Sequence, residues 1–212
     1  VAMRRRLEAT AGEAWTALDR KVRNQVRKAE RSSLSVHVGG ASELGAFYGV
    51  YSRNMRDLGT PAQSLGFFRA IVAALGARAV CTVVRHGDTP MAAALTIRHR
   101  DTVEVPWASA TRTSRAVSAN SLLYWSLLQQ AIRSGAAVFD FGRSSPDSGT
   151  YVFKKQWGAE PTQLYWECVL PPGRPLPNLT PENPAFGPAI AVWKHLPLSL
   201  TTLVGQIGRA HV

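Results

Sequence analysis

The twenty residues Phe139–Gly158, FDFGRSSPDSGTYVFKKQWG, combine a strand, a tight turn and a short basic helix in direct succession. Residues 137–141 alternate around an aspartate and end at Gly142, which is typical of a buried strand whose chain turns sharply on leaving the sheet. Residues 143–149 are mostly turn formers, including a proline and a glycine. The stretch therefore predicts a strand that leaves its sheet through a tight loop.

A short helix is predicted directly after this loop. We expect it to run from Tyr151 to Trp157, with Thr150 as its N-cap and Gly158 at its end. It would carry two aromatic side chains on one face and the cations Lys154 and Lys155 beside them. The sequence therefore predicts a concentration of positive charge next to a strand exit.

Asp140 lies between two phenylalanines of the predicted strand, where a buried carboxylate needs a partner. It is either a general base with a raised pKa or a hydrogen-bonded structural residue. We favour the structural role.

A second basic stretch lies upstream. From Trp15 to Glu30 apolar residues recur three and four positions apart, which predicts a helix with one packed side. The other side is cationic, with Arg23, Asn24 and Arg27 as candidate substrate-binding residues. Arginine offers a planar fork to phosphate and carboxylate groups, so this side is either a binding surface or an ordinary solvated basic face.

The remaining pattern predicts an α/β (α+β) fold, with a mixed, mostly antiparallel central sheet flanked by helices. Helices are expected over residues 42–59, 64–75 and 118–134. Strands are expected over 34–38, 79–86, 91–98 and 102–110, with a closing strand over 163–170 beside the Phe139 strand.

Two motifs resemble a known family. FDFGRS followed by GTYVFKKQWGA resembles the C-terminal signature of the FemAB/FemX aminoacyltransferases, which build peptide bridges in bacterial peptidoglycan, and of related FemAB-like acyltransferases with the GNAT fold. Residues 18–30, LDRKVRNQVRKAE, resemble the basic helix that opens the second GNAT-like domain of those proteins. The resemblance spans most of residues 15–170 and implies a GNAT-like fold.

The resemblance also suggests a division of the chain. Residues 15–170 form the expected GNAT-like FemAB-type domain, and residues 1–14 are interpreted as the remnant of a truncated N-terminal part, because the family normally carries another GNAT-like domain there. Residues 171–212 are expected to form a linker and terminal helices, and residues 207–212 resemble a translated sequencing adapter.

The reaction that the resemblance implies is attack of an amine on an ester or thioester carbonyl, through a tetrahedral oxyanion. Such catalysis needs donors aimed at the oxygen that gains charge. The resemblance assigns this work to Phe153, through a nearby main-chain N–H, and to the ammonium of Lys154. The alternative for Lys154 is a surface cation that stabilises the end of a short helix.

Further residues are candidates for substrate binding. Arg143 at the strand exit can hold a carboxylate or phosphate with two hydrogen bonds, and Tyr124 serves either the core or a pocket. The remaining candidates are cationic: Lys155, Arg112 and Arg115. The loop over residues 111–118 has no glycine, so it lacks the glycine-rich pattern of a pyrophosphate cradle. This makes acyl-CoA the weaker of the two candidate donors and fits aminoacyl-tRNA, the donor that the resemblance to FemX-like enzymes implies. No bound cofactor is expected.

Composition limits the function classes. The formal charge of +11 favours an anionic partner, such as RNA, a nucleotide-linked precursor or an anionic membrane surface contacted peripherally. Cys81 and Cys168 lie in apolar runs and are expected to be reduced and buried, and no motif indicates a metal or hydrolase site. No apolar run reaches the roughly 18 residues of a spanning helix, and a cytoplasmic location is expected.

The function that the FemAB/FemX resemblance implies is transfer of an acyl or aminoacyl group to an amino group of a cell-envelope (peptidoglycan) precursor. Two alternatives remain open. One is an N-acyltransferase of exopolysaccharide biosynthesis, which would share the fold. The other is a non-catalytic module that binds RNA or another anion through its basic helix.

Overall fold

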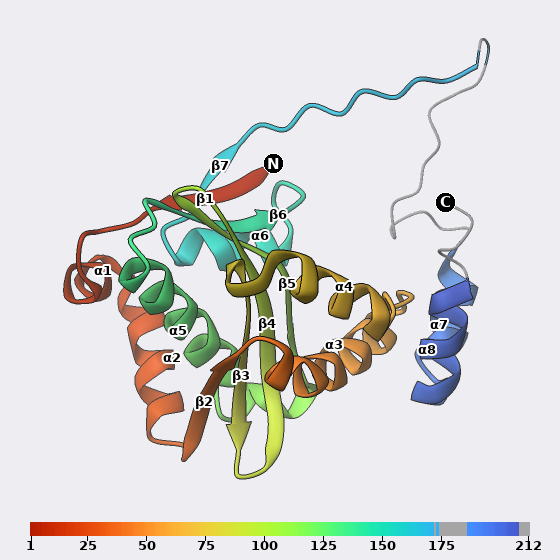
Figure 1. Cartoon of the computed structure of the whole chain (residues 1–212), viewed down its shortest axis with the longest axis horizontal. Helices are drawn as coiled ribbons and strands as arrows, with labels where there is room; N and C mark the ends of the chain where they lie inside the picture. The colour runs from red at the N-terminus through yellow and green to blue at the C-terminus, as the bar shows by residue number, and fades with distance from the viewer. Residues whose placement is uncertain (172, 174–185, 208–212) are drawn as a thin grey trace.

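The computed structural model describes residues 1–171, 173 and 186–207, and its described strands form a single sheet (Figure 1). The strands are β1 (Ala2–Arg6), β2 (Leu34–Gly39), β3 (Ala79–His86), β4 (Thr89–His99), β5 (Thr102–Ala110), β6 (Val138–Arg143) and β7 (Glu160–Thr162). The α-helices are α1 (Ala11–Ala17), α2 (Arg20–Glu30), α3 (Leu44–Leu58), α4 (Leu65–Leu75), α5 (Ala119–Arg133), α6 (Gly149–Gln156), α7 (Gly187–Trp193) and α8 (Leu198–Ile207). Short 3-10 helices are η1 (Ala41–Glu43), η2 (Gly76–Arg78) and η3 (Arg112–Arg115).

The sheet has the order β2-β3-β4-β5-β6-β1-β7, and only the β5–β6 pair among these neighbours is parallel. This confirms the expected mixed, mostly antiparallel sheet flanked by helices. The parallel pairing covers three residues on each strand, Thr102–Glu104 opposite Val138–Asp140. Beyond it β5 continues beside β4 and β6 continues beside β1, so the two strands separate towards their carboxyl ends.

Gly142 stands at this separation with a φ of +76°. A β-carbon placed there would lie 3.3 Å from the carbonyl oxygen of Val105 on β5. Both the left-handed backbone and the close approach favour glycine. Gly142 therefore determines the turn at which β6 leaves the sheet.

Helices cover both faces of the sheet (Figure 1). On one face α2 and α5 pack against the strands through a core that includes Val26, Leu127 and Phe139. On the other face α3 and α4 bury Phe47 and Phe68 against β3, β4 and β5. Among the residues that the structure describes, no helix is both long and apolar enough to cross a membrane.

The prediction of a closing strand over residues 163–170 is wrong. These residues have no regular structure, and Trp166 and Val169 are 72% and 100% exposed. The neighbour of β6 is instead β1, and the short strand β7 pairs with β1 in turn. The backbone groups that the predicted strand would have met are already paired. Cys168 falls in this segment and is exposed, so its expected burial is also wrong.

Residues 1–14, which were set apart as a remnant, are part of this fold. Met3 of β1 is fully buried, and Arg5 is 5% exposed. The Arg5 guanidinium donates to the carbonyl oxygens of Trp157 (2.9 Å) and Ala14 (3.3 Å) and to the Glu8 carboxylate (2.7 Å). These bonds compensate its burial. These bonds allow β1, which contains three consecutive arginines, to lie inside the sheet between β6 and β7.

The predicted helix over residues 15–30 is two helices, because Leu18 has an extended backbone between them. Asp19 caps α2 by accepting a hydrogen bond from the Lys21 N–H at 2.6 Å. The cap of α6 also differs from the prediction: Ser148, not Thr150, accepts a hydrogen bond from the Tyr151 N–H.

At the C-terminal end of the described residues, α8 packs against α3. Most of the linker, with residues 208–212 of the adapter-like end, lies outside the described residues.

Candidate functional site

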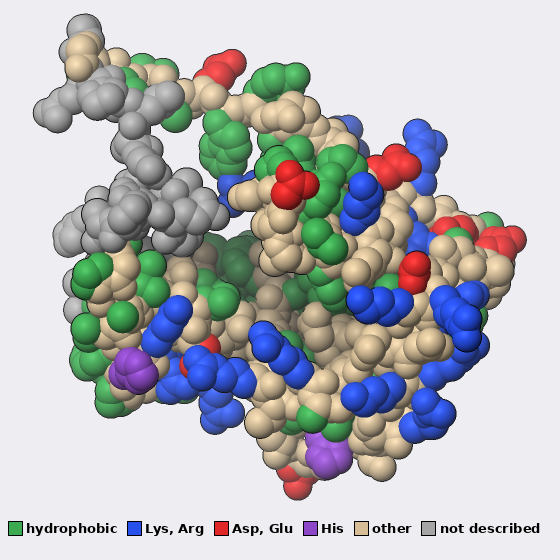
Figure 2. Space-filling model, turned by 180° about the vertical axis from the view of Figure 1, so that it is seen from behind, with side chains coloured by type: hydrophobic (Ala, Val, Ile, Leu, Met, Phe, Trp, Pro, Cys, Tyr) green, Lys and Arg blue, Asp and Glu red, His purple; other side chains and the backbone are tan. Residues whose placement is uncertain are grey.

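A cavity of about 780 Å³ lies where β5 and β6 separate. Its walls come from the end of β5, from η3 and the first turns of α5, from α6, from one side of α2 and from the C-terminal end of α3. Figure 2 shows Lys and Arg side chains around a hollow on the face of the molecule opposite to that of Figure 1. A cavity of this size is within the usual range for small-molecule sites.

The charged side chains that line the cavity are mostly cationic. Four basic side chains border it, and its one acidic side chain, Asp57, is already paired. The Asp57 carboxylate lies 2.8 Å from the Arg56 guanidinium and 3.0 Å from that of Arg112. The four basic residues are Lys21, Arg112, Arg115 and Lys154. This balance favours an anionic ligand.

Lys154 enters the site from α6 and is only 8% exposed. Its Nζ donates to the carbonyl oxygens of Gly142 at 3.2 Å and Arg143 at 2.7 Å. Burial lowers the pKa of Lys154 from 10.5 to about 8, and the nearby Asp140 carboxylate opposes this shift. Its protonation therefore changes near physiological pH.

Aromatic side chains form the wall beside Lys154. The ring centroid of Tyr124 lies 5.1 Å from that of Phe153 and 5.9 Å from that of Trp157. Tyr124 is buried, which raises its pKa to about 12, so it stays a neutral phenol. This wall gives the cavity an apolar side next to its buried amine.

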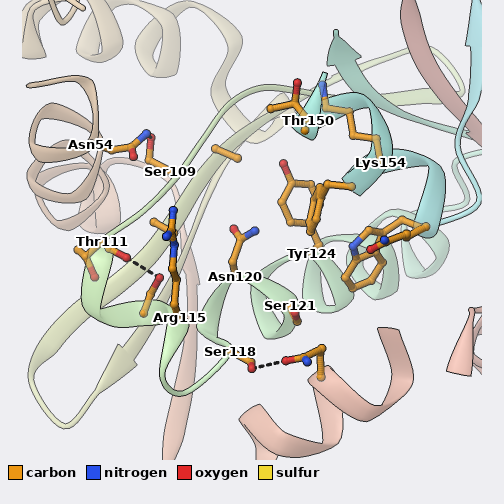
Figure 3. A pocket seen from close by; sticks show the side chains of 18 of the residues that line it. Asn54, Ser109, Thr111, Arg115, Ser118, Asn120, Ser121, Tyr124, Thr150 and Lys154 are labelled. Atoms are coloured by element: carbon orange, nitrogen blue, oxygen red, sulfur yellow. Dashed lines mark hydrogen bonds between the residues drawn. The ribbon is translucent and has the colours of Figure 1, made fainter. Parts of the chain in front are cut away.

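The opposite end of the cavity is polar (Figure 3). Arg115 and Thr111 lie there, away from Lys154, with Asn120 between the two ends. The first turn of α5 also borders the cavity, and Ser118 makes no capping bond to it, because its hydroxyl donates to Gln25 at 2.6 Å. A helix N-terminus flanked by arginine attracts anions. This end suits a phosphate or carboxylate group.

The structure brings some of the candidate residues together and leaves others apart. Lys154, Phe153, Tyr124, Arg112 and Arg115 all line the cavity.

The other candidates lie outside its lining. The Arg143 guanidinium lies over the Trp166 ring, 5.0 Å from the centroid, and Lys155 is exposed. Arg27 lies over Trp15 at 5.5 Å. Arg23 and Asn24 also lie outside the cavity lining. The side of α2 that faces the cavity carries Lys21, Val22 and Gln25.

Two contributions were missed by the sequence analysis. Lys21 and Gln25, four residues apart on one helix face, border the cavity. Asn54 and Asp57 of α3 border it too, and the Asn54 amide donates to Ser109 of β5 at 3.2 Å. The four-residue spacing on α2 was a usable signal. The role of α3 depends on tertiary packing and has no local signal. Among the described residues, no three His, Cys, Asp or Glu side chains gather to hold a metal ion.

The fold and the site together define a class. A mixed sheet whose two parallel strands separate around a basic cavity is the arrangement of a GNAT-type acyltransferase. The chain belongs to the acetyltransferase (GNAT) domain family, whose model matches residues 18–155. The expected acyltransferase class is thereby confirmed.

Solved structures show the same fold. FemX matches with a TM-score of 0.68 at 15% identity, over 75% of this chain and 58% of FemX. L-PGS from Bacillus licheniformis matches with a TM-score of 0.52 at 15% identity, over 74% of this chain and 55% of that one. An aminoglycoside acetyltransferase from an uncultured soil metagenomic sample, in complex with sisomicin, matches with a TM-score of 0.54 at 8% identity. The match covers 66% of this chain and 99% of the acetyltransferase.

The chain thus spans a little more than half of FemX and of L-PGS. At these identities the likeness concerns the fold, and the expected FemX-like GNAT fold is confirmed. No curated protein sequence matches this chain significantly.

Proposed function

We propose that this chain is a FemAB-type acyl-transfer domain that moves an acyl or aminoacyl group onto an amino group of an anionic cell-envelope precursor. The observation that carries the proposal is Lys154, a buried amine in a basic cavity at the separation of β5 and β6. The FKK motif around Lys154 and the likeness to FemX support this type over other GNAT activities.

In the proposed reaction the acceptor amine attacks the carbonyl carbon of the donor ester or thioester. The C–N bond forms, the C–O or C–S bond breaks, and the proton lost by the amine passes to the leaving oxygen or sulfur. Negative charge gathers on the carbonyl oxygen in between, so a fixed donor at that oxygen accelerates the reaction.

Lys154 is suited to be this donor. An ammonium group has three N–H bonds, and two of them are held by the carbonyl oxygens of Gly142 and Arg143. The third is then left for the oxyanion, in a fixed direction. The charged form is required, so the proposed role predicts loss of activity as pH rises through about 8, the pKa of Lys154.

Arg112, Arg115 and the first turn of α5 are proposed to hold a phosphate group of a substrate. The same groups suit a terminal phosphodiester of aminoacyl-tRNA or the pyrophosphate of acyl-CoA. The lack of glycine in residues 111–118 favours the tRNA donor, as the sequence analysis argued.

The test is an assay of the purified protein with aminoacyl-tRNA and acyl-CoA as alternative donors and a muropeptide precursor or an amino sugar as acceptor. Lys154→Ala is expected to lower kcat about 100- to 1,000-fold, the usual effect of removing one oxyanion donor. Lys28→Ala removes an exposed lysine of α2 and is the control.

Equal activity of Lys154→Ala and Lys28→Ala would remove Lys154 from the mechanism. Transfer only to the amino sugar would favour the exopolysaccharide alternative. Salt-sensitive RNA binding with no transfer to any amine would leave only a binding module.

A further inference from the structure

Both carboxylate oxygens of Asp140 are engaged in fixed hydrogen bonds. Asp140 lies on β6 and is 6% exposed. One oxygen accepts from the Gly142 N–H at 2.8 Å, and the other accepts from Arg4 Nε of β1 at 2.8 Å. Asp140 therefore connects the neighbouring strand β1 to the turn at Gly142.

The same turn holds Lys154. Gly142 has a φ of +76°, and its carbonyl and that of Arg143 accept the two hydrogen bonds from Lys154 Nζ. The direction of these carbonyls depends on the backbone conformation at Gly142, which the Asp140 carboxylate fixes through the N–H. A continuous path of hydrogen bonds thus runs from Arg4 through Asp140 and the turn to the amine.

We infer that Asp140 and Arg4 form a positioning pair for Lys154: they hold the turn whose carbonyls orient the amine, and the Asp140 carboxylate is a negative charge close to it. The inference rests on the role proposed above for Lys154. It makes β1 part of the transfer machinery, although neither Asp140 nor Arg4 borders the cavity.

The charges around the amine support this arrangement. Asp140 acts on Lys154 as the attractive charge that opposes the effect of burial on its pKa. Glu104 stands directly across from Asp140 on β5, and burial, followed by the Asp140 charge, raises the pKa of Glu104. Further charged or titratable groups lie close to these residues. They are Arg4 and Arg5 of β1, Glu160 of β7 (the register partner of Arg4), Arg143 of β6, Lys155 of α6, Tyr124 of α5 and the N-terminal amine, which donates to the Ser144 carbonyl at 3.2 Å.

Asp140→Asn removes the negative charge and the acceptor for Arg4 Nε, because the second oxygen becomes an NH2 donor, and it retains one acceptor for the Gly142 N–H of the turn. We expect the titration of Lys154 to move to lower pH, and the alkaline limb of kcat/KM to move with it. Asp140→Ala also removes the acceptor for the Gly142 N–H, and we expect kcat to fall about 100-fold, the cost of a displacement of roughly 1 Å at a reacting group.

The titration is read directly by NMR of protein labelled with 13C at lysine Cε. The chain has five lysines, and the Lys154 signal is assigned as the one absent in Lys154→Arg. A folded Asp140→Asn variant in which Lys154 titrates as in the unmodified protein would overturn the inference, because Asp140 would then have only a structural role.

Arg4→Gln tests the pair from the other strand. The Arg4 side chain is 49% exposed, so this variant is expected to fold even if changes at Asp140 do not. Removing a positive charge should move the Lys154 titration to higher pH, opposite to Asp140→Asn, and loosening of Asp140 should lower kcat. Arg6→Gln is the matched control. Arg6 is an exposed arginine on the same strand, and its register partner on β6 is Val138, which has no charge. Identical behaviour of the two arginine variants would also refute the inference.

These measurements distinguish two kinds of failure. The NMR titration needs no substrate, so it tests the positioning pair even if the protein transfers nothing to any acceptor. Absence of transfer by the unmodified protein would refute the proposed function, whereas an unshifted Lys154 titration in an active enzyme would refute only the positioning role.

Discussion

The buried amine of Lys154 predicts a specific dependence of stability on pH. Burial lowers the pKa of Lys154 from 10.5 to about 8. At about 1.4 kcal/mol per pKa unit, the difference between the unfolded and folded states corresponds to about 3 kcal/mol. The side chain is only 8% exposed, so solvent screens this penalty weakly.

The sign follows from proton binding. Below about pH 7 Lys154 is charged in both states, and the folded protein carries the full cost of burying the charge. Between pH 8 and 10.5 the folded protein has released the proton and the unfolded chain has not. The unfolded state then binds more protons, so the free energy of unfolding contributed by this residue rises with pH. Above that range both states are neutral and the cost is gone.

Lys154→Met isolates this contribution, because methionine has a similar length and no charge. We expect the free energy of unfolding of the unmodified protein, minus that of Lys154→Met, to be flat below pH 7 and to rise by about 3 kcal/mol towards pH 10.5. Other titrating groups cancel in this difference. Urea denaturation followed by the fluorescence of the six tryptophans measures it. A difference that does not change with pH would show that the amine is solvated, and the argument for a buried oxyanion donor would fail.

Three further predictions concern the turn, the core and the anion end of the cavity. Gly142→Ala should lower the free energy of unfolding by about 1–2 kcal/mol, measured by urea denaturation, because alanine resists a positive φ. Trp157→Ala should cost about 3–5 kcal/mol in the same measurement, since Trp157 is 1% exposed in the core beside the site. Arg115→Ala should raise the donor KM about tenfold by removing a charged hydrogen bond, whereas Arg143→Ala, outside the cavity lining, should change it less; equal effects would contradict this placement.

Much of the fold follows from local patterns. The alternation of residues 79–86 and 102–110 and the three- and four-residue spacing of the helices are properties of single elements, and they predict β3, β5, α3 and α4. Which strand lies beside β6 is not a local property. Residues 163–170 alternate well, but the basic strand β1 takes that place. Its Arg5 is buried only because Glu8 and two carbonyls from distant segments accept its hydrogen bonds.

The residues of the site also fall into those predicted from a local motif and those placed by tertiary packing. Lys154 and Phe153 were predicted from a motif whose strand, turn and helix are contiguous, so their geometry is nearly fixed by local structure. Lys21 and Asp57 border the same cavity because α2 and α3 converge on it from opposite faces of the sheet. The spacing of Lys21 and Gln25 shows only that they share a helix face, and no local pattern places α3 beside them.

Arg143 shows where the local argument reaches its limit. It follows Gly142 directly, and a regular strand exit would have turned its side chain towards the helix that carries Lys154. The positive φ of Gly142 changes the direction of the chain at that point, so Arg143 offers Lys154 its carbonyl oxygen, and its guanidinium lies over Trp166. The residue expected to bind substrate with its charge thus contributes an acceptor from its backbone. For this reason a substitution of Arg143 that preserves the backbone should leave the orientation of Lys154 intact, whereas a change at Gly142 or Asp140 should disturb it.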